Sequence, residues 1–189
     1  IKAVLDVIAE SPQKHGRFRN KAILLLLRDT GMRIGELRAM NVEDLDLENK
    51  RARIKTEKTR GMVPFRNVFW EDECNAAIKE WLEERKRFLK DRKKTSEALF
   101  ICNHRDTGVA RIGATAINIA FRKASWVAGI ETLNPHSLRH RKGHKLASNG
   151  ANNSVISKVL GHSTLASSFV YTQLNDKETE VAARKYGAE

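Results

Sequence analysis

The sequence predicts a mainly helical domain with a small antiparallel β-sheet, an α+β fold. Apolar residues recur at helical spacing over most of the chain. One short segment instead alternates apolar and basic residues, as a strand with one buried face does. The length of 189 residues is enough for one hydrophobic core without stabilising disulfides or metals. We therefore expect a single domain, with no internal repeat.

The predicted helices follow one another along the chain. The first carries Val4, Val7 and Ile8 on one face, and the second contains the unbroken apolar run 22–27. A third is expected to begin near Arg33. The later helices are expected over 71–89, 112–128 and, as three further helices, from 136 to the C-terminus.

The strand signal is local. Residues 51–56 alternate so that Ala52 and Ile54 face the same way. A polar turn over 57–61 ends in glycine, and we expect the return strand over 62–65. Residues 41–49 are expected to form an acidic connector, and residues 99–102 are expected to form a short strand.

The charge of the chain favours a polyanionic partner. Lysine and arginine number 35 against 23 acids, which gives a net charge of +12. Such a surplus attracts nucleic acid, and DNA is the commonest polyanion, although charge alone does not separate a DNA enzyme from an RNA-binding protein. The basic side chains that we expect to contact a phosphate backbone are Arg111, Arg122, Lys142, Lys145 and Lys158.

Composition also bounds the cellular setting. Cys74 and Cys102 lack metal-ligand spacing, which favours free thiols in a reducing compartment. The sequence contains no apolar run of membrane-spanning length and no signal-peptide pattern, so we expect a cytoplasmic protein. Because the chain begins at Ile1, we expect a fragment or a processed form.

Arg33 is the first candidate for binding a phosphate. It follows Thr30-Gly31 at a predicted helix start, where backbone N–H groups and the helix dipole favour anions. The alternative is a surface arginine paired with Glu36 at i, i+3. Glu36 can also orient the guanidinium while Leu37 packs in the core.

The segment 135–140 places His136 and Arg139 one helical turn apart, where both could bind one phosphate. His140 and His144 continue the i, i+4 spacing, which could also chelate zinc. Because this segment contains no acidic or cysteine ligand and is crowded with lysines and arginines, we favour a supporting role for His140 and expect no metal.

Three further residues complete the candidate set. Gly161 is expected to end a helix in the left-handed region, from which His162 projects. Tyr171 is either a buried aromatic or an oxygen nucleophile that nearby arginines activate. The polar turn holds Lys58, and Lys55 ends the strand before it.

Three sequence boxes and a tyrosine occur together in this order: Thr-Gly-Met-Arg-x-Gly-Glu-Leu around Arg33, His-x-Leu-Arg-His from His136, Leu-Gly-His ending at His162, and Val-Tyr-Thr around Tyr171. From Ile1 to about Leu174 the chain resembles the catalytic domain of the tyrosine recombinases, the phage integrase and Xer-like family. The resemblance implies that family's catalytic-domain fold over 1–174 and a tail helix over 175–189 that packs on a neighbouring protomer. It also implies that the family's separate N-terminal DNA-binding domain is absent here.

The resemblance implies site-specific recombination of double-stranded DNA without a metal or cofactor. Tyr171 would form a 3′-phosphotyrosyl intermediate, stabilised by Arg33 and Arg139. His162 and His136 would assist. A hairpin lysine would protonate the leaving oxygen: Lys58, or Lys55 as the alternative, because the register of the turn is ambiguous. The resemblance further implies a homo-oligomer on DNA, a tetramer in the synaptic complex, near the nucleoid. The alternatives are relaxation of DNA like that by a type IB topoisomerase, and a catalytically silent DNA-binding module.

Overall fold

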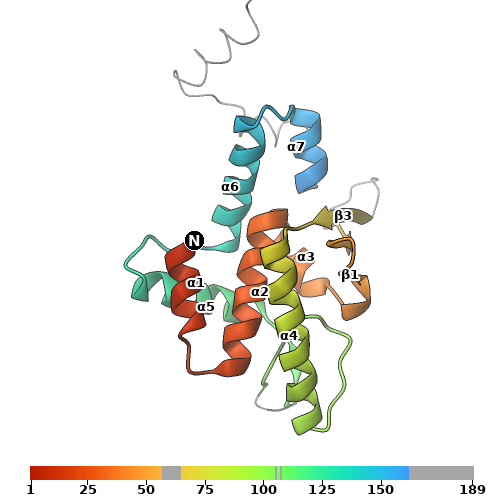
Figure 1. Cartoon of the computed structure of the whole chain (residues 1–189), viewed down its shortest axis with the longest axis vertical. Coiled ribbons are helices and arrows are strands. Elements are labelled where there is room, and N and C mark those ends of the chain that lie inside the picture. The colour runs from red at the N-terminus through yellow and green to blue at the C-terminus, as the bar shows by residue number, and fades with distance from the viewer. Residues whose placement is uncertain (57–64, 105, 107, 162–189) are drawn as a thin grey trace, which may run out of the picture.

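Helices α2 (Lys14–Thr30) and α4 (Asp72–Asp91) lie side by side at the centre of the molecule (Figure 1). The structure is a computed structural model that describes residues 1–56, 65–104, 106 and 108–161. The apolar run 22–27 of α2 is fully buried. A helix that is apolar all round must be covered on every side, and α1 (Lys2–Ala9), α4 and α6 (Pro135–Ser148) all contact α2.

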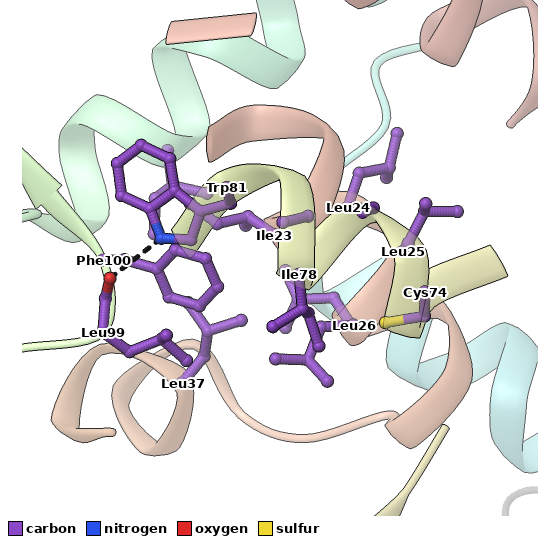
Figure 2. Packing of buried hydrophobic residues seen from close by; sticks show 14 of the residues in the cluster. Ile23, Leu24, Leu25, Leu26, Leu37, Cys74, Ile78, Trp81, Leu99 and Phe100 are labelled. Atoms are coloured by element: carbon purple, nitrogen blue, oxygen red, sulfur yellow. Dashed lines mark hydrogen bonds between the residues drawn. The ribbon is translucent and has the colours of Figure 1, made fainter. Parts of the chain in front are cut away.

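The core forms where α4 and the following segment cover α2. The indole nitrogen of Trp81 donates a hydrogen bond to the backbone oxygen of Leu99, 2.9 Å away (Figure 2). Burying the indole among apolar neighbours such as Ile23 therefore leaves no unpaired N–H at this point. Cys74 lies in the same core, and both Cys74 and Cys102 are free thiols, as predicted.

A three-stranded antiparallel sheet packs beside these helices, in the order β1 (Leu45–Asp46), β2 (Arg51–Lys55), β3 (Phe65–Phe69). In β2 the alternation predicted from the sequence is confirmed, since Ala52 and Ile54 are buried and their neighbours are exposed. The mainly helical class with a small antiparallel sheet is thus confirmed.

Two sequence-based predictions for this sheet were wrong. The return strand, expected over 62–65, does not end at Phe65 but continues to Phe69, where Lys55 pairs with Phe65 and Arg51 with Phe69; residues 62–64 lie outside the described part. The segment 41–49, expected as a connector, contains the short helix η1 (Val42–Asp44) and strand β1. β1 depends on its pairing with β2, and a two-residue strand carries no periodicity of its own.

A second, two-stranded sheet joins β4 (Ile101–Cys102) to β5 (Ala110–Arg111). It leads into α5 (Ala114–Val127), which contacts α1. The helix bounds differ from the predicted ones by one or two residues, which is the usual uncertainty at helix ends.

Helices α6 and α7 (Asn153–Leu160) lie at the top of the view in Figure 1, and the end of α7 approaches β3. Asn134 caps α6 by accepting a hydrogen bond from the N–H of Ser137, and Pro135 occupies the first turn. The third helix expected at the C-terminus lies outside the described residues. No helix in the described part of the chain is both long and apolar enough to cross a lipid bilayer.

Candidate active site

The link between α2 and α3 (Ile34–Ala39) sets the position of Arg33. Gly31 ends α2 in the left-handed region with φ 61°, a conformation that glycine adopts without steric cost. Met32, fully buried, then anchors the turn. Arg33 follows as the N-cap of α3, so the helix start predicted for it is confirmed.

Glu36 holds Arg33 at two points. Its Oε2 accepts a hydrogen bond from the backbone N–H of Arg33 at 2.8 Å, and its Oε1 pairs with Nη1 of Arg33 at 3.2 Å. The Glu36 side chain is fully buried, and so is Leu37. The i, i+3 ion pair expected between Arg33 and Glu36 is therefore also the interaction that orients the guanidinium. The side chain of Arg33 stays 24% exposed.

The Leu-Gly-His box meets this arginine directly. Gly161 ends α7 in the left-handed region, with φ 68° and ψ 50°, as its position predicted. Its carbonyl oxygen accepts a hydrogen bond from Nη1 of Arg33 at 2.9 Å. Two boxes separated by 128 positions therefore lie in contact.

Arg139 comes to the same place from α6. It is 5% exposed, and its Nη1 donates to the backbone oxygen of Gly31 at 2.8 Å. A Cβ added at Gly31 would lie 2.7 Å from Cδ2 of Leu160. Gly31 of the first box therefore lies against Arg139 of the second box and Leu160 of the third. Both arginines thus lie beside the Leu160–Gly161 turn.

His136 and His140 contact each other along α6. Their Nε2 atoms are 2.7 Å apart, so one ring donates to the other. Burial lowers the pKa of His140, and the charges of His136, His144 and Arg139 lower it further. Within the described residues no group of three or more histidine, cysteine or acidic side chains is arranged to hold a metal ion. On α6, His136 is exposed and Arg139 is buried.

Of the candidates for the leaving-group acid, only Lys55 is described. It is the last residue of β2 and is exposed. Lys58, His162 and Tyr171 lie outside the described residues, and so does the tail 175–189.

Sequence analysis missed Arg66, which belongs to this cluster. Its Nη2 pairs with Oε2 of Glu36 at 2.7 Å, and its Nη1 donates to the backbone oxygen of Val159 at 2.8 Å. The signal that could have found it is an arginine on the buried face of a strand, two residues before Val68. The misplaced return strand concealed that signal.

Comparison with known proteins identifies the group to which the chain belongs. A model of the phage integrase family matches residues 1–178. The chain belongs to the phage integrase family. The predicted family and its catalytic-domain fold are thereby confirmed.

Relatives of this phage integrase family member are named as recombinases. Tyrosine recombinase XerC of Corynebacterium glutamicum is 33% identical over 181 residues, which are 94% of this chain and 54% of that protein. The crystal structure of XerA recombinase is 27% identical, with a TM-score of 0.76, and covers 100% of this chain and 61% of that one.

A third similar protein was solved with DNA. XerH site-specific recombinase, bound to its difH substrate in a pre-cleavage complex, is 25% identical with a TM-score of 0.75. The match covers 100% of this chain and 52% of XerH. The chain thus spans about half the length of the curated relatives that it matches.

Proposed function

We propose that this chain is the catalytic part of a site-specific DNA recombinase, which cuts and rejoins DNA strands through a covalent 3′-phosphotyrosyl intermediate. The observation that carries the proposal is the hydrogen bond between Arg33 and Gly161 beside the one between Arg139 and Gly31. Family membership supports it. In this proposal residues 1–174 form the catalytic domain and 175–189 a tail that packs on a neighbouring protomer.

The proposed reaction is an in-line exchange at phosphorus. The phenolic oxygen of Tyr171 attacks the scissile phosphate and forms a P–O bond, while the bond from phosphorus to the 5′ oxygen breaks. His136 accepts the phenolic proton, and a hairpin lysine protonates the departing 5′ oxygen. We assign that lysine to Lys58, with Lys55 as the alternative. A 5′-hydroxyl from another strand reverses the same steps and rejoins the DNA.

The two arginines neutralise the charge that develops in the transition state. The Nη1 atom of Arg33 is held by Glu36 and Gly161. No hydrogen bond within the described part of the chain engages its Nε or Nη2, so this edge of the guanidinium can donate to two phosphate oxygens. Such preorganised donors stabilise charge without reorganising during the reaction. His162 would add a further hydrogen bond.

The contact between His136 and His140 suits the role proposed for His136. His140 does not touch the phosphate in this proposal; it fixes the ring of His136 through the 2.7 Å contact. In this arrangement Nε2 of His136 donates to Nε2 of His140, which leaves Nδ1 of His136 to accept a proton.

The proposed partner is double-stranded DNA, on which a tetramer would assemble, in the cytoplasm near the nucleoid. The net charge of +12 favours phosphate contacts, so affinity should fall steeply with salt. Arg111, one of the basic residues considered for such contacts, instead donates to the backbone oxygens of Arg38 and Met40 and to the side chain of Asn41. Its guanidinium therefore helps to hold the fold together.

The test uses a pool of nicked duplexes with a randomised core, from which the short fragment that carries the freed 5′-hydroxyl diffuses away after cleavage. Wild-type protein should become covalently attached to a DNA 3′ end, and Tyr171→Phe should bind the same pool without attaching. Equal adduct yields from the two proteins would reject Tyr171 as the nucleophile. No adduct from the wild type, together with retained binding, would favour a silent DNA-binding module.

A further inference from the structure

Arg66 lies on the face of β3 that should be apolar. In the sheet it pairs with Ile54, and directly paired residues of antiparallel strands point to the same side. Ile54 is 2% exposed and Val68, two residues along β3, is 3% exposed. A charged group on such a face is retained only when other groups compensate the loss of water.

Two hydrogen-bond acceptors compensate Arg66 for its loss of water, and each binds a different nitrogen of the guanidinium. Its Nη2 lies 2.7 Å from Oε2 of Glu36, and its Nη1 lies 2.8 Å from the backbone oxygen of Val159. The side chain is 10% exposed. Arginine can serve both partners at once because its planar fork holds several donors in fixed directions, which a lysine ammonium on a flexible stem does not.

The same guanidinium lies against the glycine of the third box. A Cβ added at Gly161 would lie 2.5 Å from Nε of Arg66 and 3.0 Å from its Cδ. Arg66 therefore contacts the last turn of α7 at Val159 and at Gly161. The carbonyl oxygen of Gly161 is the one that holds Arg33.

These contacts make Glu36 the centre of a buried arginine–glutamate–arginine arrangement. One carboxylate oxygen, Oε2, accepts from the backbone of Arg33 and from Arg66, and the other pairs with the guanidinium of Arg33. Moving Arg66 would therefore disturb two of the groups that set the direction of the Arg33 guanidinium: the carboxylate of Glu36 and the turn at Gly161.

We propose that Arg66 is a positioning residue for strand cleavage, which fixes Glu36 and the Leu160–Gly161 turn relative to each other and so aims the guanidinium of Arg33 at the phosphate. This inference rests on the proposed function. Because β3 pairs with β2, Arg66 also ties these two strands to the end of α7. Arg66 itself does not touch DNA.

The decisive experiment measures cleavage and binding separately for wild type, Arg66→Met and Arg66→Lys. The adduct-forming rate is taken at saturating protein on the nicked pool, and affinity is taken from a random-sequence duplex. Arg66→Met should lower the rate about 10- to 100-fold, because small displacements of a reacting group have effects of that size. Affinity should stay at the wild-type value, and Arg66→Lys should recover part of the rate.

Arg85 offers a matched control. It is also a buried arginine, 8% exposed, and it donates to the backbone oxygens of Ala98 and Ser96, on the segment that follows α4. Arg85→Met should lower thermal stability yet cleave at the wild-type rate while folded. A rate loss in Arg85→Met as large as that in Arg66→Met would reduce Arg66 to a general contributor to stability and overturn the inference.

A double-mutant cycle with Glu36→Gln tests the route of the effect. If Arg66 acts through Glu36, the loss from Arg66→Met should be smaller in the Glu36→Gln background than in the wild type. If the rate losses of the two single variants are fully additive in the double variant, Arg66 does not act through Glu36.

The remaining outcomes separate this inference from the function on which it rests. A wild type that forms no adduct rejects the proposed function, and the inference falls with it. A wild type that forms the adduct while Arg66→Met keeps the full rate overturns the inference alone, as does an Arg66→Met protein that loses affinity with an unchanged rate. Should Arg66→Met fail to fold, Arg66→Lys cleaving at the wild-type rate would overturn it.

Discussion

Nη1 of Arg33 donates a hydrogen bond to the backbone carbonyl oxygen of Gly161, 2.9 Å away and 128 positions further along the chain. The same nitrogen pairs with Glu36, so one edge of the guanidinium is committed to the protein. The outer edge therefore has a fixed direction before any ligand arrives. This is the preorganisation that electrostatic stabilisation of a transition state requires.

Replacing Arg33 by lysine should abolish most of the proposed cleavage while leaving DNA binding largely intact. One ammonium cannot bond Glu36, the Gly161 oxygen and a phosphate in the geometry of a planar fork. We expect the adduct rate on the nicked pool to fall roughly 10² to 10³-fold. The control is Arg38→Lys, in the same short helix, because Arg38 donates to the backbone oxygen of Ile112. A similar fall in both variants would contradict this assignment.

Removing the carboxylate of Glu36 should destabilise the fold strongly. Glu36→Ala leaves the guanidinium groups of Arg33 and Arg66 without their shared counter-charge in a buried site, and such losses cost about 3–5 kcal/mol. Urea unfolding measures the change in free energy. Glu73→Ala is the control, since Glu73 pairs with Arg28 at the surface, is 57% exposed, and should cost about 1 kcal/mol or less. Equal losses would argue against a special role for the buried carboxylate.

Gly31→Ala should cost more stability than Gly129→Ala, although both glycines have positive φ, 61° and 65°. The backbone conformation alone costs a non-glycine residue about 1–2 kcal/mol. At Gly129 an added Cβ meets nothing within 4 Å, whereas at Gly31 it would lie 2.7 Å from Leu160 and 3.0 Å from Lys142. Overpacking adds about 1–3 kcal/mol to the loss at Gly31. Thermal unfolding of the two variants compares them, and identical stabilities would show that α2, α6 and α7 do not meet as closely as described.

His15 should make the protein less stable in mild acid. Its ring stacks on Phe88 with centroids 3.7 Å apart, and burial, followed by the charge of Arg19 and a smaller contribution from Arg92, lowers the pKa of His15 from 6.5 to about 4. Because the folded-state pKa lies below the unfolded one, the native state disfavours the proton. This contribution is complete above pH 6.5 and is lost as the pH falls from 6.5 through 4.

Comparing the wild type with His15→Leu isolates this effect from the titration of carboxylates elsewhere. The free energy of unfolding of the wild type should decrease more between about pH 7 and pH 4.5 than that of the variant, by on the order of 2 kcal/mol. Parallel pH profiles for the two proteins would mean that His15 is solvated in the folded state.

Sequence alone predicted the features that depend on neighbouring residues. The apolar run 22–27 predicted a buried helix, the alternation around Ala52 and Ile54 predicted a strand, and Gly161 predicted a left-handed helix end. All three are confirmed because periodicity and backbone sterics act within a few residues. The motif boxes predicted the family in the same way, from short segments whose residues can be compared directly.

The elements that sequence analysis missed depend on partners elsewhere in the chain. β1 is a strand only through Leu45 and Asp46 pairing with β2, and the return strand follows the register of its partner rather than its own pattern. Arg66 was missed for the same reason, since an arginine in a strand is ordinarily exposed and its burial is explained by its contacts with Glu36 and Val159, which lie elsewhere in the chain.

The sequence by itself determined roughly where the long helices lie and which residues are apolar enough to form the core, and it suggested which polar residues to consider as a phosphate-binding set. Tertiary structure alone decided that Arg33, Arg139 and Gly161 meet, that Arg66 joins them, and that His136 faces His140. The physical reason is the separation along the chain over which each kind of interaction acts. Local preferences act over one or two helical turns, whereas a hydrogen bond across 128 positions exists only after the core around α2 has packed and brought the helix ends together.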